Sequence, residues 1–318
     1  MIINLRDTTT NQIADKLVAI RREGGVVALS RVLTLLVTVG AAAAEEAIAA
    51  ANEASMEHPC RLIVLVESDF GGASTIDAEI RVGGDAGASE VVVLRFDSAM
   101  RALRASLITP LLLPDVPIVT WWPDRVPVKA IANPLGALSE RRVTDSSMAA
   151  GSLSQRLARL RAGYSPGDTD LSWTRLTWLR AHLAAVLDQP PYDKVTRVVV
   201  EGQADDPSPV LLAAWLGWKL RCHVELMCRP DIAGVQRVEL HRASGTISIE
   251  HPAGTNLATL TAPGVLPRRF QLTPPGLAEC LSEELRRLDE DIVYGEVISR
   301  GLDWLVREHC LSLEDAEN

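Results

Sequence analysis

The sequence predicts two α/β domains, each with a mixed sheet made of a parallel strand–helix–strand unit, antiparallel extensions and packing helices. Three observations support this. Long apolar runs alternate with helical segments, the same order recurs in the second half, and a proline-rich stretch separates the halves. A chain of 318 residues is long enough for two hydrophobic cores. We expect an N-terminal domain at residues 1–125, a linker or joint at 126–146, and a C-terminal domain at 147–318 that ends in long helices.

The first helix begins at a recognisable cap. Thr9 and Gln12 have the spacing of a capping box, and apolar residues follow on one helical face. The apolar run 26–39 predicts a strand that is buried on both faces, the Ala- and Glu-rich segment 41–57 predicts a helix, and 61–67 predicts another buried strand. This order implies a right-handed parallel crossover.

Residues 76–82 and 90–96 alternate around a glycine-rich loop, which predicts an antiparallel hairpin. The segment 111–124, LLLPDVPIVTWWPD, then supplies the last strand of the first domain. Its prolines indicate an edge strand. Trp121 and Trp122 would point to opposite faces. We expect them to pack in the core or at the domain joint; the alternative is that one anchors a contact with a partner.

The second half begins with two helices, and Asp170 is the expected N-cap of the later one, 171–187. A second strand–helix–strand unit is expected at 195–201, 209–220 and 223–227. An antiparallel meander is expected at 235–241, 246–251 and 256–261.

After Pro274 and Pro275 the chain should be helical almost to its end, with a break near Gly295 or Gly301. Apolar residues repeat there at coiled-coil-like spacing and are expected to pack against the second sheet. They are Leu281, Leu285, Leu288 and Ile292.

No catalytic signature is present in the sequence. A Walker A lysine, a nucleophile elbow and a zinc-binding H-E-x-x-H helix are all missing, and the glycine-rich stretches precede strands, unlike a phosphate loop. Cys222, His223 and Cys228 do not have zinc-site spacing. We expect buried structural thiols, and a redox role for Cys222 or Cys228 stays open. No catalytic residue, metal ligand or cofactor is therefore predicted.

The sequence offers contact residues instead. Arg141 and Arg142 stand beside a hydroxyl and a carboxylate, and could clamp an anion or a partner's acidic loop; the alternative is an internal salt-bridged domain joint. In residues 168–180, Trp173 and Trp178 should lie on different sides, one in the core and one facing a neighbour. The candidate partner-contact or domain-joint residues are Trp121, Trp122, Asp124, Arg141, Arg142, Thr144, Asp145, Asp170, Trp173 and Arg175.

Charge and hydropathy exclude several classes of protein. The net charge of −9 disfavours nucleic-acid binding. The N-terminus lacks the apolar core of a signal peptide, and the run 26–39 is too short and too interrupted to span a bilayer. The five scattered cysteines argue against a disulfide framework. We expect a cytoplasmic protein that binds neither nucleic acid nor membranes.

Four ordered segments resemble a known family: TTTNQIADKLVAIRREGGVVALSRVLTLLV, LLLPDVPIVTWWPD, RRVTDSS and DTDLSWTRLTWLR. Together they resemble the OpcA family, the glucose-6-phosphate dehydrogenase assembly proteins of actinobacteria and cyanobacteria. The Arg- and Ala-rich composition is similar to the actinobacterial branch. The resemblance implies a non-catalytic partner that promotes the active oligomer of the dehydrogenase at the entry to the oxidative pentose phosphate pathway, which supplies NADPH. It transfers no active-site residue.

Two functions therefore remain. The first is an assembly factor and allosteric activator that binds glucose-6-phosphate dehydrogenase. The alternative is a sugar-phosphate or nucleotide-binding α/β protein, a metabolite sensor or enzyme, whose arginines hold phosphate at the carboxyl ends of parallel strands. Ligand binding by the isolated chain discriminates between them. Whether the chain forms a homo-oligomer stays open.

Overall fold

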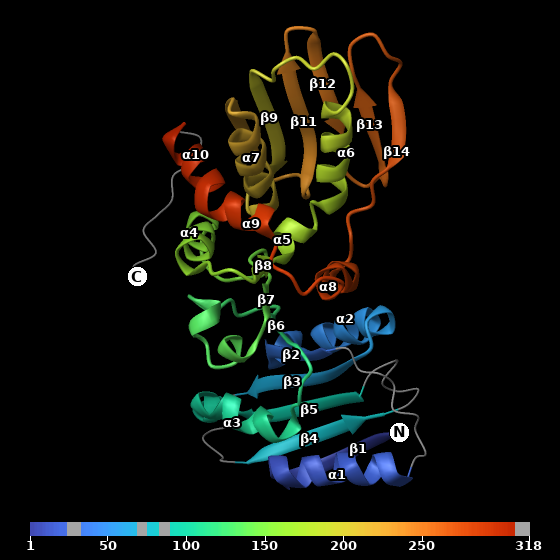
Figure 1. Ribbon diagram of the computed structural model, residues 1–318, viewed down its shortest axis with the longest axis vertical. Coiled ribbons are helices and arrows are strands. Elements are labelled where there is room, and N and C mark those ends of the chain that lie inside the picture. The colour runs from blue at the N-terminus through green and yellow to red at the C-terminus, as the bar shows by residue number, and fades with distance from the viewer. Residues whose placement is uncertain (24–32, 69–74, 83–89, 309–318) are drawn as a thin grey trace. The chain divides into compact units, whose positions relative to one another are not determined.

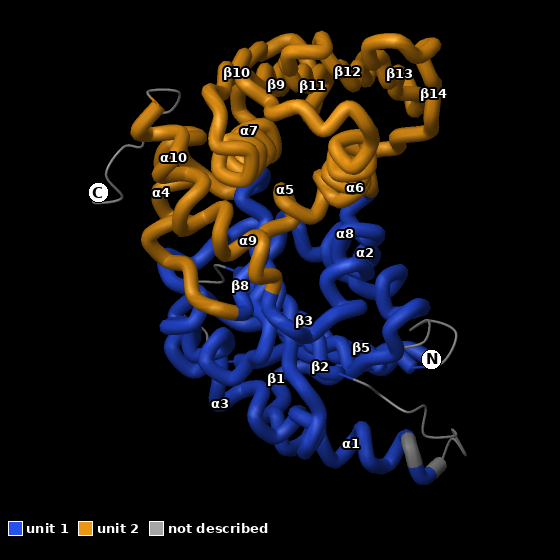
Figure 2. The backbone as a smooth tube through the Cα atoms, turned by 45° about the horizontal axis from the view of Figure 1, so that its top comes forward, with its two compact units in different colours: residues 1–148, 167–169, 276–290 blue, residues 149–166, 170–275, 291–318 orange. Residues whose placement is uncertain are grey.

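The computed structural model describes residues 1–23, 33–68, 75–82 and 90–308. The chain forms two compact units, which Figure 2 shows in blue and orange. Unit 1 consists of residues 1–148, 167–169 and 276–290, and unit 2 of residues 149–166, 170–275 and 291–318. Each half of the chain contributes a mixed sheet with a parallel crossover and antiparallel extensions, so the predicted fold class is confirmed.

The sheet of unit 1 has the strand order β1-β4-β5-β3-β2-β6-β7-β8. Strands β5, β3, β2, β6 and β7 run parallel, while β4 and β1 extend the sheet in antiparallel fashion. Its strands are β1 (Ile2–Thr8), β2 (Leu33–Gly40), β3 (Cys60–Ser68), β4 (Ile76–Arg81), β5 (Glu90–Asp97), β6 (Ile118–Trp122), β7 (Arg141–Thr144) and β8 (Asp168–Asp170). Residues 26–32 of the predicted strand 26–39 and the predicted loop at 83–89 lie outside the described residues.

The capping box at the first helix is confirmed. The Gln12 side-chain oxygen accepts the Thr9 N–H at 2.9 Å, and the Thr9 hydroxyl accepts the Gln12 N–H at 3.3 Å. This helix, α1 (Thr10–Glu23), buries its apolar face in the core of unit 1. Other helical segments of unit 1 are η1 (Ala41–Ala43), α2 (Ala44–Glu57), η3 (Ser98–Leu103), α3 (Arg104–Ile108), η4 (Thr109–Leu111), η5 (Ala130–Ala132), η6 (Gly136–Leu138) and α8 (Leu277–Leu285).

The prediction that the tryptophan pair lies on an edge strand is wrong. Strand β6 pairs with β2 on one side and with β7 on the other. Pro117 and Pro123 stand just outside β6, so they remove no donor from its ladder, and the Pro117 carbonyl accepts the Thr34 N–H at 2.8 Å. The residues expected as a linker, 126–146, contribute β7 to this sheet.

Unit 2 holds a sheet in the order β10-β9-β11-β12-β13-β14. Strands β9 and β10 are parallel and joined by α7, and β11 to β14 form an antiparallel meander. Strand β14, with the sequence RRFQ, was not expected. The strands are β9 (Arg197–Gln203), β10 (His223–Arg229), β11 (Val235–Arg242), β12 (Gly245–Glu250), β13 (Leu257–Thr261) and β14 (Arg268–Gln271).

Helices cover one face of this second sheet. In Figures 1 and 2, α6 (Thr177–Leu187) and α7 (Pro207–Leu220) lie side by side against it. Their leucines and valines interlock with inward-facing strand residues in one core. The remaining helices of unit 2 are α4 (Leu153–Gly163), α5 (Leu171–Thr174), α9 (Ile292–Glu296) and α10 (Leu302–Arg307), with the π-helical turn η7 (Val297–Gly301) before α10. No helix among the described ranges combines the length and apolar character needed to cross a membrane.

The C-terminal helices differ from the expectation. The helical chain is interrupted between α8 and α9, before Gly295 and Gly301 are reached. Helix α8 packs against α2 within unit 1 and does not belong to the core that covers the second sheet. The expected coiled-coil-like repeat also fails, because Leu281 and Leu285 are buried whereas Ile292 is exposed.

Candidate functional site

The tryptophan pair belongs to the interior of unit 1. Trp121 is 0% and Trp122 1% exposed. Because successive strand residues point to opposite faces, the two indoles fill the two sides of the sheet, and Trp122 packs in the cluster that includes α1. Neither indole N–H has a hydrogen-bond partner in the described part of the chain. Packing is therefore their role in this conformation, which leaves no side-chain surface for a partner.

The arginine pair on β7 is also buried, and each guanidinium meets a carboxylate of unit 1. Arg141 pairs with Glu284 and donates to the Asp289 carbonyl at 2.9 Å. Arg142 pairs with Asp168 and donates to the Ser139 carbonyl at 2.8 Å. Both ion pairs lie within unit 1, and neither guanidinium is accessible to an external anion in this conformation.

Thr144 and Asp145, which follow on the chain, are buried as well. The Thr144 hydroxyl donates to the Thr169 carbonyl at 3.1 Å. One Asp145 carboxylate oxygen accepts the Ser147 N–H at 3.2 Å and the Ser147 hydroxyl at 2.6 Å. These bonds shape the exit from β7.

The segment 168–180 contains one buried tryptophan and one exposed tryptophan. Asp170 caps α5 by accepting the Ser172 N–H at 3.0 Å. Trp173 is fully buried, its indole N–H donates to Asp291 at 2.8 Å, and the Arg180 guanidinium lies 3.7 Å from the ring centroid. Trp178 is 61% exposed. Of this pair, Trp178 has the surface that a partner could bury.

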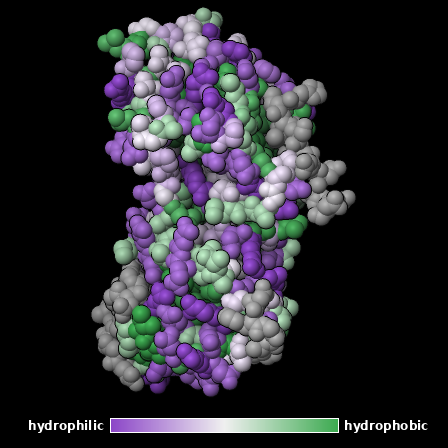
Figure 3. Space-filling view, turned by 180° about the vertical axis from the view of Figure 1, so that it is seen from behind, coloured by the Kyte–Doolittle hydropathy of each residue, from purple (hydrophilic) through white to green (hydrophobic). Residues whose placement is uncertain are grey.

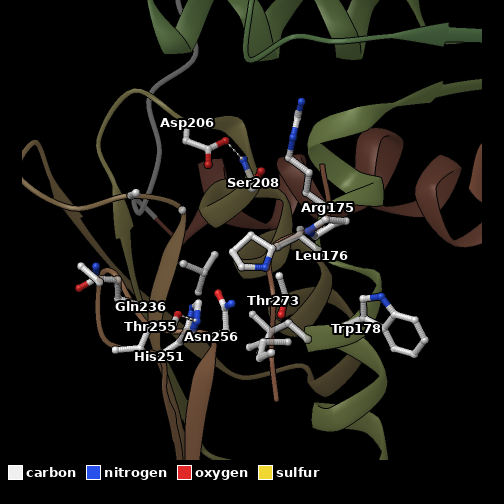
Figure 4. Close-up of a pocket in the computed structure, with 18 of the residues that line it drawn as sticks. Arg175, Leu176, Trp178, Asp206, Ser208, Gln236, His251, Thr255, Asn256 and Thr273 are labelled. Carbon is white, nitrogen blue, oxygen red and sulfur yellow. Dashed lines mark hydrogen bonds between the residues drawn. The ribbon is translucent and has the colours of Figure 1, made fainter. Parts of the chain in front are cut away.

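Trp178 stands at a pocket of about 540 Å³ within unit 2. Figure 4 shows the helix side of this pocket, with Leu176 and Trp178, and the strand side, with Gln236, His251 and Asn256. Arg175, one of the predicted site residues, is also part of the lining. Sequence reasoning missed the pocket because its walls come from separate segments and share no motif.

The pocket combines apolar walls with a few polar groups, as ligand and side-chain pockets do. The Gln236 amide nitrogen is buried and has no hydrogen-bond partner among the residues that the structure describes. The His251 ring nitrogen Nε2 lies 2.8 Å from the Thr255 carbonyl. The site therefore suits an apolar group that also offers a hydrogen-bond acceptor.

The two candidate thiols have environments that disfavour the reactive thiolate. Cys222 is buried as predicted, and burial raises its pKa to about 11. The prediction of a buried thiol is wrong for Cys228, which is exposed, although partial desolvation raises its pKa above the ordinary value. A thiol with a raised pKa holds its proton at neutral pH. In the described part of the chain, no group of His, Cys, Asp and Glu side chains could hold a metal ion.

The surface offers few broad apolar areas on the face that Figure 3 displays. Hydrophilic side chains predominate there, and hydrophobic ones form small separate groups. On this face, a contact would depend on individual anchoring side chains.

Two family models match the chain. The model for the glucose-6-phosphate dehydrogenase subunit N-terminal domain matches residues 51–162, and the model for the C-terminal domain of that subunit matches residues 166–298. Among curated proteins, no sequence matches. A crystal structure of an oxidoreductase from Thermotoga maritima is similar at 10% identity over 90% of this chain and 97% of that chain. Its TM-score of 0.40 is too low to support an argument about fold or function.

Proposed function

The chain belongs to the OpcA family of glucose-6-phosphate dehydrogenase subunits, and we propose that it is a non-catalytic assembly factor and allosteric activator of that enzyme. The observation that carries the proposal is the match of both domain models, in order, to residues 51–162 and 166–298. A role associated with the dehydrogenase follows from the family, and activation is the step that we add. The arginine-rich composition supports the actinobacterial branch.

An activator of this kind works through differential affinity. It must bind the active conformation or oligomer of the enzyme more tightly than the inactive one, by a coupling free energy of about 1–3 kcal/mol. Such an activator supplies contact surface and no reacting group. We place it in the cytoplasm with its enzyme, where it raises the supply of NADPH.

We infer that the rim of the unit 2 pocket contacts the dehydrogenase. Trp and Arg are enriched among the residues that dominate interface energies. Trp178 is 61% exposed and Arg175 lines the same pocket, whereas Trp121, Trp122 and Trp173 are buried in the fold. Burying the exposed indole against the enzyme would remove a large apolar surface from water.

A titration of the dehydrogenase with the purified chain tests the proposal. The rate of NADP reduction at a fixed, low glucose 6-phosphate concentration should rise and saturate. Trp178→Ala should raise the half-saturating concentration about thirtyfold or more, as expected for an interface anchor of at least about 2 kcal/mol. An unchanged rate at every concentration of the wild-type chain would contradict activation.

Tyr192 provides the matched control. It is also an exposed aromatic residue of unit 2, at 76%, but it does not line the pocket. Tyr192→Ala should leave the half-saturating concentration unchanged. Equal effects of the two substitutions would remove the pocket rim from the contact surface.

A further inference from the structure

In unit 1 the order of the parallel strands reverses beside β2. On one side β2 pairs with β3, and β5 pairs with the far side of β3. On its other side β2 pairs with β6, which comes later in the chain. In open α/β sheets, ligands bind outside the carboxyl ends of the strands at such a reversal. Here these ends are Gly40 of β2 and Trp122 of β6, which Asp124 and Arg125 follow.

The backbone at the end of β2 lies close to these two side chains. Asp124 Oδ2 accepts the Gly40 N–H at 3.0 Å. A Cβ atom on Gly40 would lie 2.8 Å from Asp124 Oδ2 and 3.1 Å from Arg125 Nη2. A side chain at position 40 would displace the ends of the Asp124 and Arg125 side chains from the end of β2.

Three guanidiniums meet one carboxylate at the neighbouring strand end. Glu67 near the end of β3 has a side chain that is only 1% exposed. Its Oε2 lies 2.8 Å from Arg101 Nη2 and 3.1 Å from Arg125 Nη1, and its Oε1 meets Arg104 Nη2. The arginines come from η3, from the start of α3 and from the segment after β6, so the fold gathers them from both sides of the reversal.

Among the described residues, positive charge exceeds negative charge in this cluster. Glu67 is the only carboxylate within ion-pair distance of the three arginines in the described ranges, and adding Asp124 still leaves an excess of positive charge. Asp97, at the end of β5, accepts the Ala99 N–H at 2.9 Å and caps η3. Burial and, second, the positive charge of the nearby Arg125 lower the pKa of Arg104.

The cluster also has free donors that solvent can reach. Each guanidinium carries five N–H groups, more than Glu67 can accept from three of them. The Arg104 Nε also lacks a partner in the described part of the chain, but it is buried, so the accessible donors belong to the other two arginines. The side chains of Arg101 and Arg125 are 54% and 50% exposed, so a solute can approach both.

We propose that Arg101, Arg104 and Arg125 form a binding site for the phosphate group of a phosphorylated small metabolite, at the carboxyl edge of β2, β3 and β6. Guanidiniums bind phosphate oxygens in bidentate fashion, and a dianion would compensate the excess charge. This site goes beyond the role of an activator that acts only through protein contacts, because the chain itself would bind a metabolite.

Isothermal titration of the full-length chain, without the dehydrogenase, tests the site. Inorganic phosphate and glucose 6-phosphate should both bind, and glucose should not. Tighter binding of glucose 6-phosphate than of phosphate would show that the sugar adds contacts, whereas equal binding would show an adaptable phosphate site. Arg101→Gln and Arg125→Gln should each weaken binding about tenfold or more, because each substitution removes charge-assisted hydrogen bonds to the phosphate.

Arg197 is the matched control in unit 2. It is similarly exposed and pairs with the Glu225 carboxylate at 3.4 Å. Arg197→Gln should leave phosphate binding unchanged. No binding of either phosphate compound up to about 10 mM, a range weaker than ordinary specific binding, would overturn the proposal. Unchanged affinity in both cluster variants would also overturn it.

A second measurement needs no variant. Phosphate should protect Arg101 and Arg125 of the wild-type chain from labelling by phenylglyoxal, read by mass spectrometry, and should not protect Arg197. Equal labelling with and without phosphate would contradict the site. Because the dehydrogenase is absent from both experiments, their failure would leave the activation proposal standing, and the failure of activation would leave phosphate binding standing.

Discussion

Arg141 on β7 pairs with Glu284 on α8, 143 residues further along the chain. Both side chains are buried within unit 1. Residues 276–290 therefore belong to the structure that the N-terminal part of the chain builds, and their loss would expose the buried guanidinium of Arg141.

Removing the Glu284 carboxylate should destabilise the chain. Glu284→Ala leaves Arg141 buried without its ion pair, and breaking a buried pair from one side costs about 3–5 kcal/mol. The neighbouring Glu283 is the control, since it pairs with Arg286 at the surface. Glu283→Ala should change stability by less than about 1 kcal/mol. Urea unfolding followed by circular dichroism measures both, and equal losses would contradict the assignment.

The buried tryptophans of β6 should be structural. Trp121→Ala and Trp122→Ala should each lower the free energy of unfolding by about 3–5 kcal/mol, the usual effect of removing a large core aromatic. Trp178→Ala removes the same atoms from an exposed position and should have an effect within about 1 kcal/mol. A folded, stable Trp121→Ala chain would show that the indole is not part of the core.

Asp291 should stabilise unit 2 through two bonds at once. One carboxylate oxygen caps α9 by accepting the Tyr294 N–H at 2.8 Å, and the other accepts the Trp173 indole N–H at 2.8 Å. Asp291→Ala should cost about 1–3 kcal/mol, because it leaves the buried indole N–H unsatisfied. Asp231, which forms an exposed pair with Arg229, is the control, and its replacement by Ala should have little effect in the same thermal or urea unfolding experiment.

The stability of the chain should fall in alkaline solution as Cys222 ionises. Burial raises its pKa from 9.0 to about 11 in the folded chain. Because the pKa of this thiol is higher in the folded chain than in the unfolded chain, the protonated thiol contributes its full stabilisation below pH 9.0. This contribution is lost as the pH rises from 9.0 toward 11. Cys222→Ala should flatten this part of the stability curve relative to the wild-type chain. Parallel curves would show that Cys222 is not the group responsible.

The predictable parts of the fold are those that local pattern specifies. The buried strands β2 and β3 follow from continuous apolar runs, and the start of α1 follows from Thr9 and Gln12. Strand β14 escapes prediction, because RRFQ lacks the apolar alternation of a half-buried strand.

Contacts between segments that are distant in the sequence cannot be predicted from local pattern. The prolines near β6 favour an edge strand, but they stand outside it, so β7 can pair there. The apolar face of α8 predicts that this helix is buried, but it does not indicate against which element. In the structure the partner is α2. The arginines around Glu67 and the lining of the unit 2 pocket come from separated segments, so only the folded chain brings each set together.

Sedimentation of purified glucose-6-phosphate dehydrogenase with and without the chain tests the central claim most directly. The account predicts a new, faster-sedimenting species that contains both proteins and has a higher specific activity than the dehydrogenase alone. Two proteins that sediment independently, at the unchanged activity of the enzyme alone, would contradict it.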